Sequence, residues 1–128
     1  MTISCGTGAP DFDEDSAFDY LIAQCDLGPR NPGSEGYYAC LDLMLSELDK
    51  TADEIIIQEF SYQEQKYKKR YDLQNVIARF NPEAEFQTII SCHWDTRPWA
   101  DMEEKRRDKQ QPIIGANDGA SGVAVLLE

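Results

Sequence analysis

Histidine is almost missing from this sequence, and several other features are missing altogether. There is one histidine, His93, and the four cysteines form no CxxC pair, so neither a zinc ribbon nor a thioredoxin-type motif is indicated. No apolar run approaches the roughly 18 residues of a membrane-spanning helix, so no transmembrane segment is expected. Basic residues are few: 12 Lys and Arg stand against 24 Asp and Glu, which gives a net charge of −12. So acidic a chain offers no basic face for phosphates, and nucleic acid is excluded as a partner.

The cysteines that are present divide into two kinds. Cys25, Cys40 and Cys92 lie in apolar stretches, which is typical of buried thiols rather than of metal ligands. Cys5 differs, because TISCG followed by TGAPDFDED resembles the end of a lipoprotein signal and its tether. The positive and apolar regions of such a signal are absent, so either the start codon is placed too late or the resemblance is accidental. A lipid anchor at Cys5 would place the protein outside the cytoplasm, in the periplasm or as a lipoprotein.

The 128 residues are enough for one small domain whose core needs no disulfide. Residues 1–12 predict a flexible leader, and residues 13–128 predict the N-terminal part of a single domain. A first helix is indicated over residues 15–25, with an approximate capping box of Ser16 and Asp19 and an apolar face of Phe18, Leu21, Ile22 and Cys25. Glycines and prolines in residues 28–33 end this helix. Ser34 caps a second helix that reaches about Leu48, with a face of Tyr38, Leu41, Leu45 and Leu48.

The middle of the chain predicts strands. Residues 54–62 and 73–80 are rich in β-branched and aromatic side chains, and residues 86–93 have few polar ones, as in a strand buried on both faces. Residues 94–117 show no periodicity and exceed the about 12–15 residues usual for a loop inside a compact domain, so this loop is disordered or functional. Residues 119–128 begin a further helix. Helices, then strands, then a strand–loop–helix unit indicate the first part of an α/β domain.

Two short motifs suggest a site. His93 and Asp95 follow the apolar run 86–92, and residues i and i+2 of a strand project from the same face. A carboxylate beside an imidazole can orient it as a metal ligand. Asp118 lies in GANDGASG, where small neighbours let the backbone approach a ligand closely. Each motif has an ordinary alternative: His93 as a hydrogen-bonded surface residue, and the Asp118 motif as a tight turn in which Asp118 or Ser121 caps the helix.

Taken together, the motifs resemble one family. HWDTRPWAD, a charged loop, then PIIGANDGASGVAVLLE, with GPRNPGSEGYYAC and QNVIARF upstream, are similar to the zinc aminopeptidase and glutaminyl cyclase family from about Phe18 to the last residue. The resemblance implies a three-layer α/β/α fold around a mixed central sheet, with zinc at the strand ends.

The resemblance also implies roles for individual residues. If the chain functions as the two-metal aminopeptidases do, His93 would bind one zinc ion and Asp118 would bridge both zinc ions. If it functions as the cyclases do, Asp118 would bind a single zinc ion and His93 would be a site residue that binds no metal. In either case Asp95 would orient the site, and Asn117 and Gly119 would form the supporting loop, with a cis peptide between Asp118 and Gly119.

The expected activity is cyclisation of an N-terminal glutamine to pyroglutamate, with the peptide's own α-amine attacking the side-chain amide and ammonia leaving. SCHWDTRPWAD resembles bacterial cyclases of the animal type, whereas NDGASG resembles the general peptidase pattern. The alternative is a zinc aminopeptidase, and a third hypothesis is a non-catalytic binding module on the same scaffold. Substrates would be peptide or protein N-termini.

The ligand set that the resemblance implies extends beyond these residues. The family's glutamate pair and a later histidine ligand would lie C-terminal to Glu128. Catalytic zinc normally has three protein ligands, and the sequence offers two at most. The chain alone is therefore expected to be inactive and to hold zinc weakly.

Overall fold

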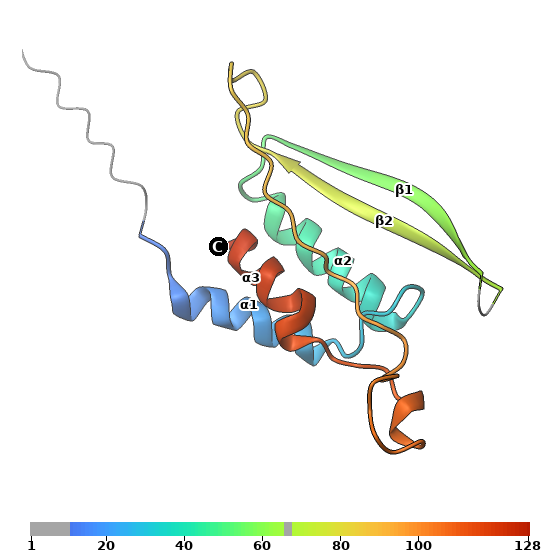
Figure 1. Cartoon of the computed structure of the whole chain (residues 1–128). Coiled ribbons are helices and arrows are strands. Elements are labelled where there is room, and N and C mark those ends of the chain that lie inside the picture. Colours follow the sequence, from blue (N-terminus) through green and yellow to red (C-terminus); the bar gives the residue numbers. More distant parts are fainter. Residues whose placement is uncertain (1–10, 66–67) are drawn as a thin grey trace, which may run out of the picture.

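A computed structural model describes residues 11–65 and 68–128, so most of the predicted leader and the anchor candidate Cys5 lie outside the described residues. Figure 1 shows a hairpin lying along one long helix, with two further helices packed against each other beyond it. The elements in chain order are α1 (Glu14–Asp26), α2 (Glu35–Leu48), β1 (Glu54–Glu64), β2 (Lys69–Arg79), the short helical turns η1 (Asp108–Gln110) and η2 (Ala116–Ala120), and α3 (Ser121–Leu127). None of the described helices is long and apolar enough to cross a bilayer.

Helix α1 forms where it was predicted, but its start and its buried face differ from the prediction. The carboxylate of Asp13 accepts hydrogen bonds from the backbone N–H groups of Asp15 and Ser16, so Asp13 is the N-cap and the capping box is wrong. The buried side chains are Ala17 and Gln24, whereas Phe18 is 60% exposed. The small Ala17 allows a close approach of α3, the helix with which α1 makes its main contact.

Helix α2 confirms the predicted cap. The hydroxyl of Ser34 accepts from the backbone N–H of Tyr37 and donates to the carbonyl of Pro29, 2.8 Å away. The buried face is rotated from the predicted one and carries Tyr37, Cys40, Leu41 and Met44, while Tyr38 is 49% exposed. Apolar side chains occupy two overlapping stripes of this helix, so periodicity alone did not determine which stripe is buried.

Strands β1 and β2 pair in antiparallel fashion, and two side chains hydrogen-bond to the backbone of one residue of β2, Gln74. The hydroxyl of Tyr37 accepts from the backbone N–H of Gln74 at 3.0 Å, and the indole N–H of Trp94 donates to the carbonyl of Gln74 at 3.2 Å. The two aromatic rings stack with centroids 4.1 Å apart. Trp94 is thereby fixed between the helix and the sheet, directly after His93.

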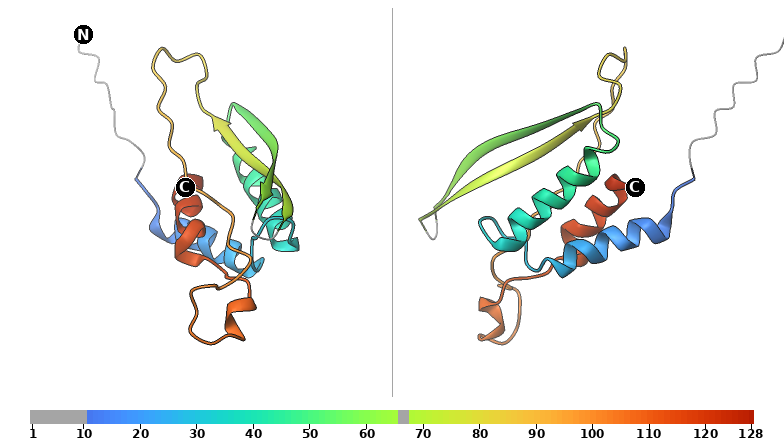
Figure 2. Two further views of the ribbon diagram at one scale, coloured as in Figure 1. Left: turned by 45° about the vertical axis from the view of Figure 1, so that its right-hand side comes forward. Right: turned by 180° about the vertical axis from the view of Figure 1, so that it is seen from behind.

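The third predicted strand does not form. Residues 86–93 run as an extended segment apart from the hairpin (Figure 2). The side chains of Phe86 and Ile89 are exposed at 86% and 91%, and Cys92 is exposed as well. A strand requires a hydrogen-bonded neighbour, and β1 with β2 is the whole sheet in the described part of the chain. The apolar run therefore indicated an extended backbone correctly, but its predicted burial on both faces is wrong.

The core lies between α2 and α3. It is built from Cys40, Leu41, Met44 and Val123, with Leu45, Val76, Trp94 and Leu127 packed against it. The contact of Trp94 with this core places the segment that follows it, residues 95–96, close to the start of α3.

Candidate metal site

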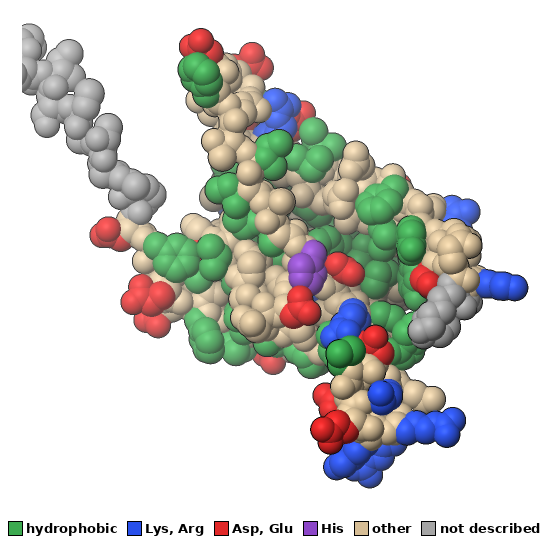
Figure 3. Space-filling model, viewed as in Figure 1, with side chains coloured by type: hydrophobic (Ala, Val, Ile, Leu, Met, Phe, Trp, Pro, Cys, Tyr) green, Lys and Arg blue, Asp and Glu red, His purple; other side chains and the backbone are tan. Residues whose placement is uncertain are grey.

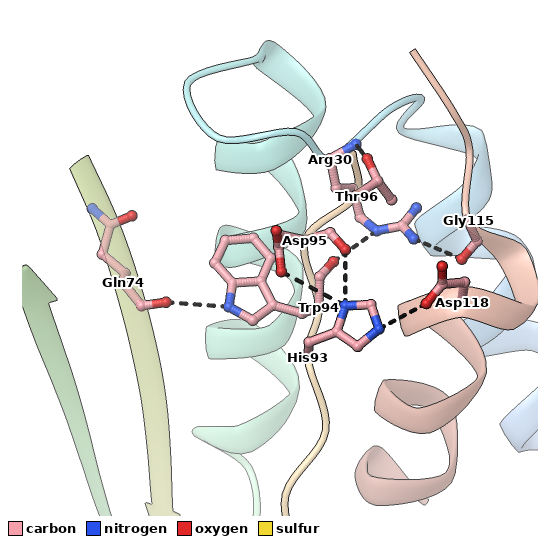
Figure 4. Close-up of polar contacts among 8 residues, drawn as sticks. All are labelled: Arg30, Gln74, His93, Trp94, Asp95, Thr96, Gly115 and Asp118. Carbon is pink, nitrogen blue, oxygen red and sulfur yellow. Dashed lines mark hydrogen bonds and ion pairs between the residues drawn. The ribbon is translucent and has the colours of Figure 1, made fainter. Parts of the chain in front are cut away.

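The structure brings together two side chains that are 25 residues apart in the sequence. The Nε2 atom of His93 lies 2.9 Å from the Oδ1 atom of Asp118, across the gap between the extended segment and the turn before α3 (Figure 4). Both side chains are more than half exposed, 55% for His93 and 64% for Asp118. Figure 3 shows the imidazole at the surface with acidic side chains beside it. The pair is therefore accessible from solvent.

Asp95 orients the imidazole through its backbone rather than chiefly through its carboxylate. The Nδ1 atom of His93 lies 3.1 Å from the carbonyl oxygen of Asp95 and 3.6 Å from its carboxylate oxygen. A neutral imidazole carries one N–H, so in the tautomer with hydrogen on Nδ1 the ring donates to this carbonyl. The lone pair of Nε2 then faces the same space as the carboxylate of Asp118. Two electron-pair donors directed into one space form an arrangement that a bound cation stabilises.

The turn that carries Asp118 depends on glycine. Gly115 has φ +64° and Gly119 has φ +102°, values that favour glycine. A Cβ atom at Gly119 would lie 3.1 Å from Cε1 of His93, so the ring packs directly on this backbone. The peptide between Asp118 and Gly119 is trans, because no cis peptide bond occurs in the described residues, and the implied cis bond is wrong. The positive φ of Gly119 makes the bend instead.

The capping alternative for Asp118 is not observed. Helix α3 has no side-chain N-cap hydrogen bond, and the hydroxyl of Ser121 donates to the carbonyl of Asn117 at 2.8 Å. Asn117 thus supports the turn through its main chain. The carboxylate of Asp118 is left to face His93.

Comparisons with known proteins match the part of the chain that contains His93, Asp95 and Asp118. Residues 75–128 match Peptidase family M28. A glutaminyl cyclase from Tannerella forsythia is 36% identical with a TM-score of 0.87, over 92% of this chain and 40% of that one. A Zn-dependent exopeptidase from Parabacteroides distasonis is 34% identical with a TM-score of 0.88, over 94% of this chain and 41% of that one. Glutaminyl-peptide cyclotransferase of Bos taurus is 24% identical over 82% of this chain and 28% of that protein. The chain is thus similar to M28 peptidases and to glutaminyl cyclases.

The predicted resemblance and fold class are thereby confirmed. The helices and strands match the fold of the glutaminyl cyclases and zinc exopeptidases, and the described residues hold part of its central sheet. The chain spans about 40% of these solved structures and 28% of the bovine relative.

The donor set fits part of a zinc site. Imidazole nitrogen and carboxylate oxygen are zinc ligands, and the two that were predicted from the sequence, His93 and Asp118, do converge. No group of three or more His, Cys, Asp and Glu side chains that could hold a metal occurs among the described residues. A catalytic zinc normally has three protein ligands, so this pair supplies a part of such a site.

The thiols take no part in the pair. Burial raises the pKa of Cys40 to about 11 and raises that of Cys92, so both favour the protonated form that binds metals poorly. The predicted burial of the three thiols is confirmed only for Cys40, because Cys25 is half-buried and Cys92 is an exposed residue.

Sequence reasoning missed Arg30, which is completely buried behind the site. Its guanidinium donates to the carbonyls of Gln24, Trp94 and Gly115. Its backbone N–H donates to the hydroxyl of Thr96, and its carbonyl accepts from the backbone N–H of the same residue. The signal available in the sequence was an arginine inside the Gly- and Pro-rich stretch GPRNPGS, a place where a solvated charge is the usual expectation.

Proposed function

We propose that the natural protein containing this segment is a zinc-dependent glutaminyl-peptide cyclotransferase. It would convert an N-terminal glutamine of a peptide or protein into pyroglutamate and release ammonia. The carrying observation is the contact of His93 with Asp118 within a chain similar to the glutaminyl cyclase of Tannerella forsythia. The similarity to the glutaminyl-peptide cyclotransferase of Bos taurus supports the same activity.

The residues of this chain would have distinct tasks. Asp118 would hold zinc, which when bound supplies a Lewis acid that polarises the side-chain amide carbonyl of the substrate. With its hydrogen on Nε2, His93 would donate to the Asp118 carboxylate, 2.9 Å away, and keep it oriented. The carbonyl of Asp95, which lies 3.1 Å from Nδ1 on the other side of the ring, would limit the rotation of the ring. The two ring nitrogens and two oxygens thus form a chain of contacts that ends at the Asp118 carboxylate.

The second candidate is a zinc aminopeptidase. The match of residues 75–128 to Peptidase family M28 and the similarity to the exopeptidase of Parabacteroides distasonis favour it. Both His93 and Asp118 would then bind metal, two zinc ions in total, and water would attack the peptide bond. The two candidates share these residues and differ in the product.

Product analysis separates the candidates. The natural protein is incubated with a peptide that begins with glutamine, and the products are identified by mass spectrometry. Cyclisation gives a peptide lighter by one ammonia, whereas hydrolysis gives free glutamine and a shortened peptide. Asp118→Asn should abolish the reaction, and the matched control Asp72→Asn, at an exposed position of the hairpin, should leave it unchanged. Free glutamine as the main product would reject the cyclase proposal.

We also propose an extracytoplasmic location for the natural protein. Its support is the lipoprotein-like stretch around Cys5, a residue outside the described part of the chain. Metabolic labelling with a fatty acid, in the wild type and in Cys5→Ala, tests it. Absence of label in the wild type would reject lipidation.

A further inference from the structure

We propose that Arg30 is the positioning residue of the metal site and sets the separation of its two ligand-bearing segments. The inference rests on the proposed function in one respect, namely that His93 and Asp118 act together at zinc. Arg30 itself touches neither side chain.

The buried guanidinium joins three segments that are far apart in the sequence. Its Nε atom donates to the carbonyl of Trp94 at 3.1 Å, and its Nη2 atom donates to the carbonyl of Gly115 at 3.1 Å. Its Nη1 atom donates to the carbonyl of Gln24 near the end of α1, at 3.3 Å. We call these three contacts the Arg30 bridge. Figure 4 shows the guanidinium above the imidazole, between the segment that carries His93 and Gly115.

Two of the three acceptors of the bridge, the carbonyls of Trp94 and Gly115, belong to the segments that carry the site residues. The Trp94 carbonyl belongs to the peptide between Trp94 and Asp95, so the contact with Arg30 fixes the backbone on which His93 and Asp95 are mounted. Gly115 begins the turn that carries Asp118, and its carbonyl also accepts from the backbone N–H of Ala120 at 3.2 Å. The rigid, planar guanidinium of Arg30 therefore holds the segment of His93 and the segment of Asp118 at a fixed distance from each other.

The cost of this arrangement argues for a specific role. Arg30 is 0% exposed, and a guanidinium stays charged in proteins. Among the described residues no carboxylate forms an ion pair with it, and carbonyl oxygens alone satisfy it. Burying a charge without an ion pair is expensive, and an apolar side chain would fill the space at lower cost. The fork geometry is what an apolar residue or a lysine cannot supply, since lysine has one point-like ammonium.

The test uses His93 as a reporter, since it is the only histidine of the chain. The imidazole NMR signals of the metal-free 128-residue chain are recorded for the wild type, Arg30→Lys, and Asp118→Ala as the reference for a lost partner. We expect Arg30→Lys to remain folded by circular dichroism and to move the imidazole signals toward those of Asp118→Ala. A folded Arg30→Lys chain with wild-type imidazole signals would overturn the proposal.

Two further variants separate positioning from simple stability. Leu127→Ala removes core packing at the end of α3 opposite to Asp118, and it should lower stability while leaving the imidazole signals as in the wild type. If it moves them as Arg30→Lys does, Arg30 acts only through stability and the proposal fails. Should Arg30→Lys not fold, Thr96→Val removes the hydroxyl that accepts from the Arg30 backbone and should give a smaller shift in the same direction. Unchanged signals in a folded Thr96→Val chain would also contradict the bridge.

The natural protein gives the second readout. Zinc affinity measured by dialysis should fall about 10–100-fold in Arg30→Lys, the range usual for residues that orient metal ligands, and should stay unchanged in Leu127→Ala. If the wild type binds no zinc or makes no pyroglutamate, the proposed function fails. The imidazole signals still decide on Arg30 in that case, because they require no metal.

Discussion

At the scale of single residues, the contact between His93 and Asp118 contributes orientation rather than stability. Both side chains are more than half exposed, and exposed ion pairs contribute at most about 1 kcal/mol. Their positions are set by backbone instead, through the Asp95 carbonyl and the glycine-dependent turn. Substitutions that change the backbone conformation near His93 or Asp118 should therefore displace these side chains more than substitutions of surface charges do.

Gly119→Ala tests this dependence. The φ of +102° and the 3.1 Å contact of the added Cβ with Cε1 of His93 should lower the free energy of unfolding by about 1–3 kcal/mol and displace the ring. Gly28→Ala is a matched control, because Gly28 has φ +85° with no atom within 4 Å of an added Cβ. Urea denaturation should show losses in both variants, whereas the imidazole NMR signals should change in Gly119→Ala alone. Equal imidazole signals in all three chains would mean that the ring does not depend on this turn.

The buried thiol of Cys40 should make the free energy of unfolding depend on pH. Burial raises its folded-state pKa from 9.0 to about 11, so the folded state holds the proton while the unfolded chain ionises. The unfolded state binds fewer protons in this window, and the free energy of unfolding should fall as pH rises from about 9 to 11. Urea titrations of the wild type and Cys40→Ala at several pH values measure it. Tyr37, whose pKa burial also raises, acts with the same sign in both chains. Parallel curves for the two chains would contradict the effect.

At the scale of elements, the hairpin depends on a few contacts with helix α2 and with Trp94. The backbone of Gln74 receives two of them, from the Tyr37 hydroxyl and the Trp94 indole. Helical spacing predicted where α2 begins and ends, because its cap and the flanking Gly and Pro residues are local signals. Its buried face depends on its partners α3 and β2, which no local pattern reveals.

Tyr37→Phe measures the attachment of the hairpin. Loss of the hydroxyl leaves the Gln74 N–H without its acceptor and should lower the free energy of unfolding by about 1 kcal/mol. Tyr38→Phe alters a neighbouring ring that is 49% exposed and should stay within about 0.5 kcal/mol of the wild type. If urea denaturation gives both variants the same stability, Tyr37 does not hold the hairpin through its hydroxyl.

The segment 86–93 should exchange its amide hydrogens fast in this chain. It has strand-like composition and an extended backbone, but within the described residues no neighbouring strand pairs with it. Hydrogen exchange followed by mass spectrometry should show it less protected than β2, which pairs with β1 along its whole length. Protection equal to that of β2 would mean that the segment is paired in solution.

At the scale of the whole molecule, the sequence predicted the site better than the packing around it. His93, Asp95 and Asp118 belong to short motifs whose spacing is read directly from the chain, and the structure does bring them together. Arg30 could not be found in that way, because its role depends on three carbonyls from segments 6, 64 and 85 residues away. The similarity to glutaminyl cyclases and zinc exopeptidases likewise concerns the whole arrangement.

The most direct measurement is equilibrium dialysis of the 128-residue chain against zinc. Net charge −12 gives a background of weak binding at the surface, so Asp118→Ala and the control Asp72→Ala are measured beside the wild type. The two-ligand site predicts weak binding with a component that is lost in Asp118→Ala and kept in Asp72→Ala. Tight stoichiometric binding that survives Asp118→Ala, or identical binding by all three chains, would contradict a zinc site at Asp118.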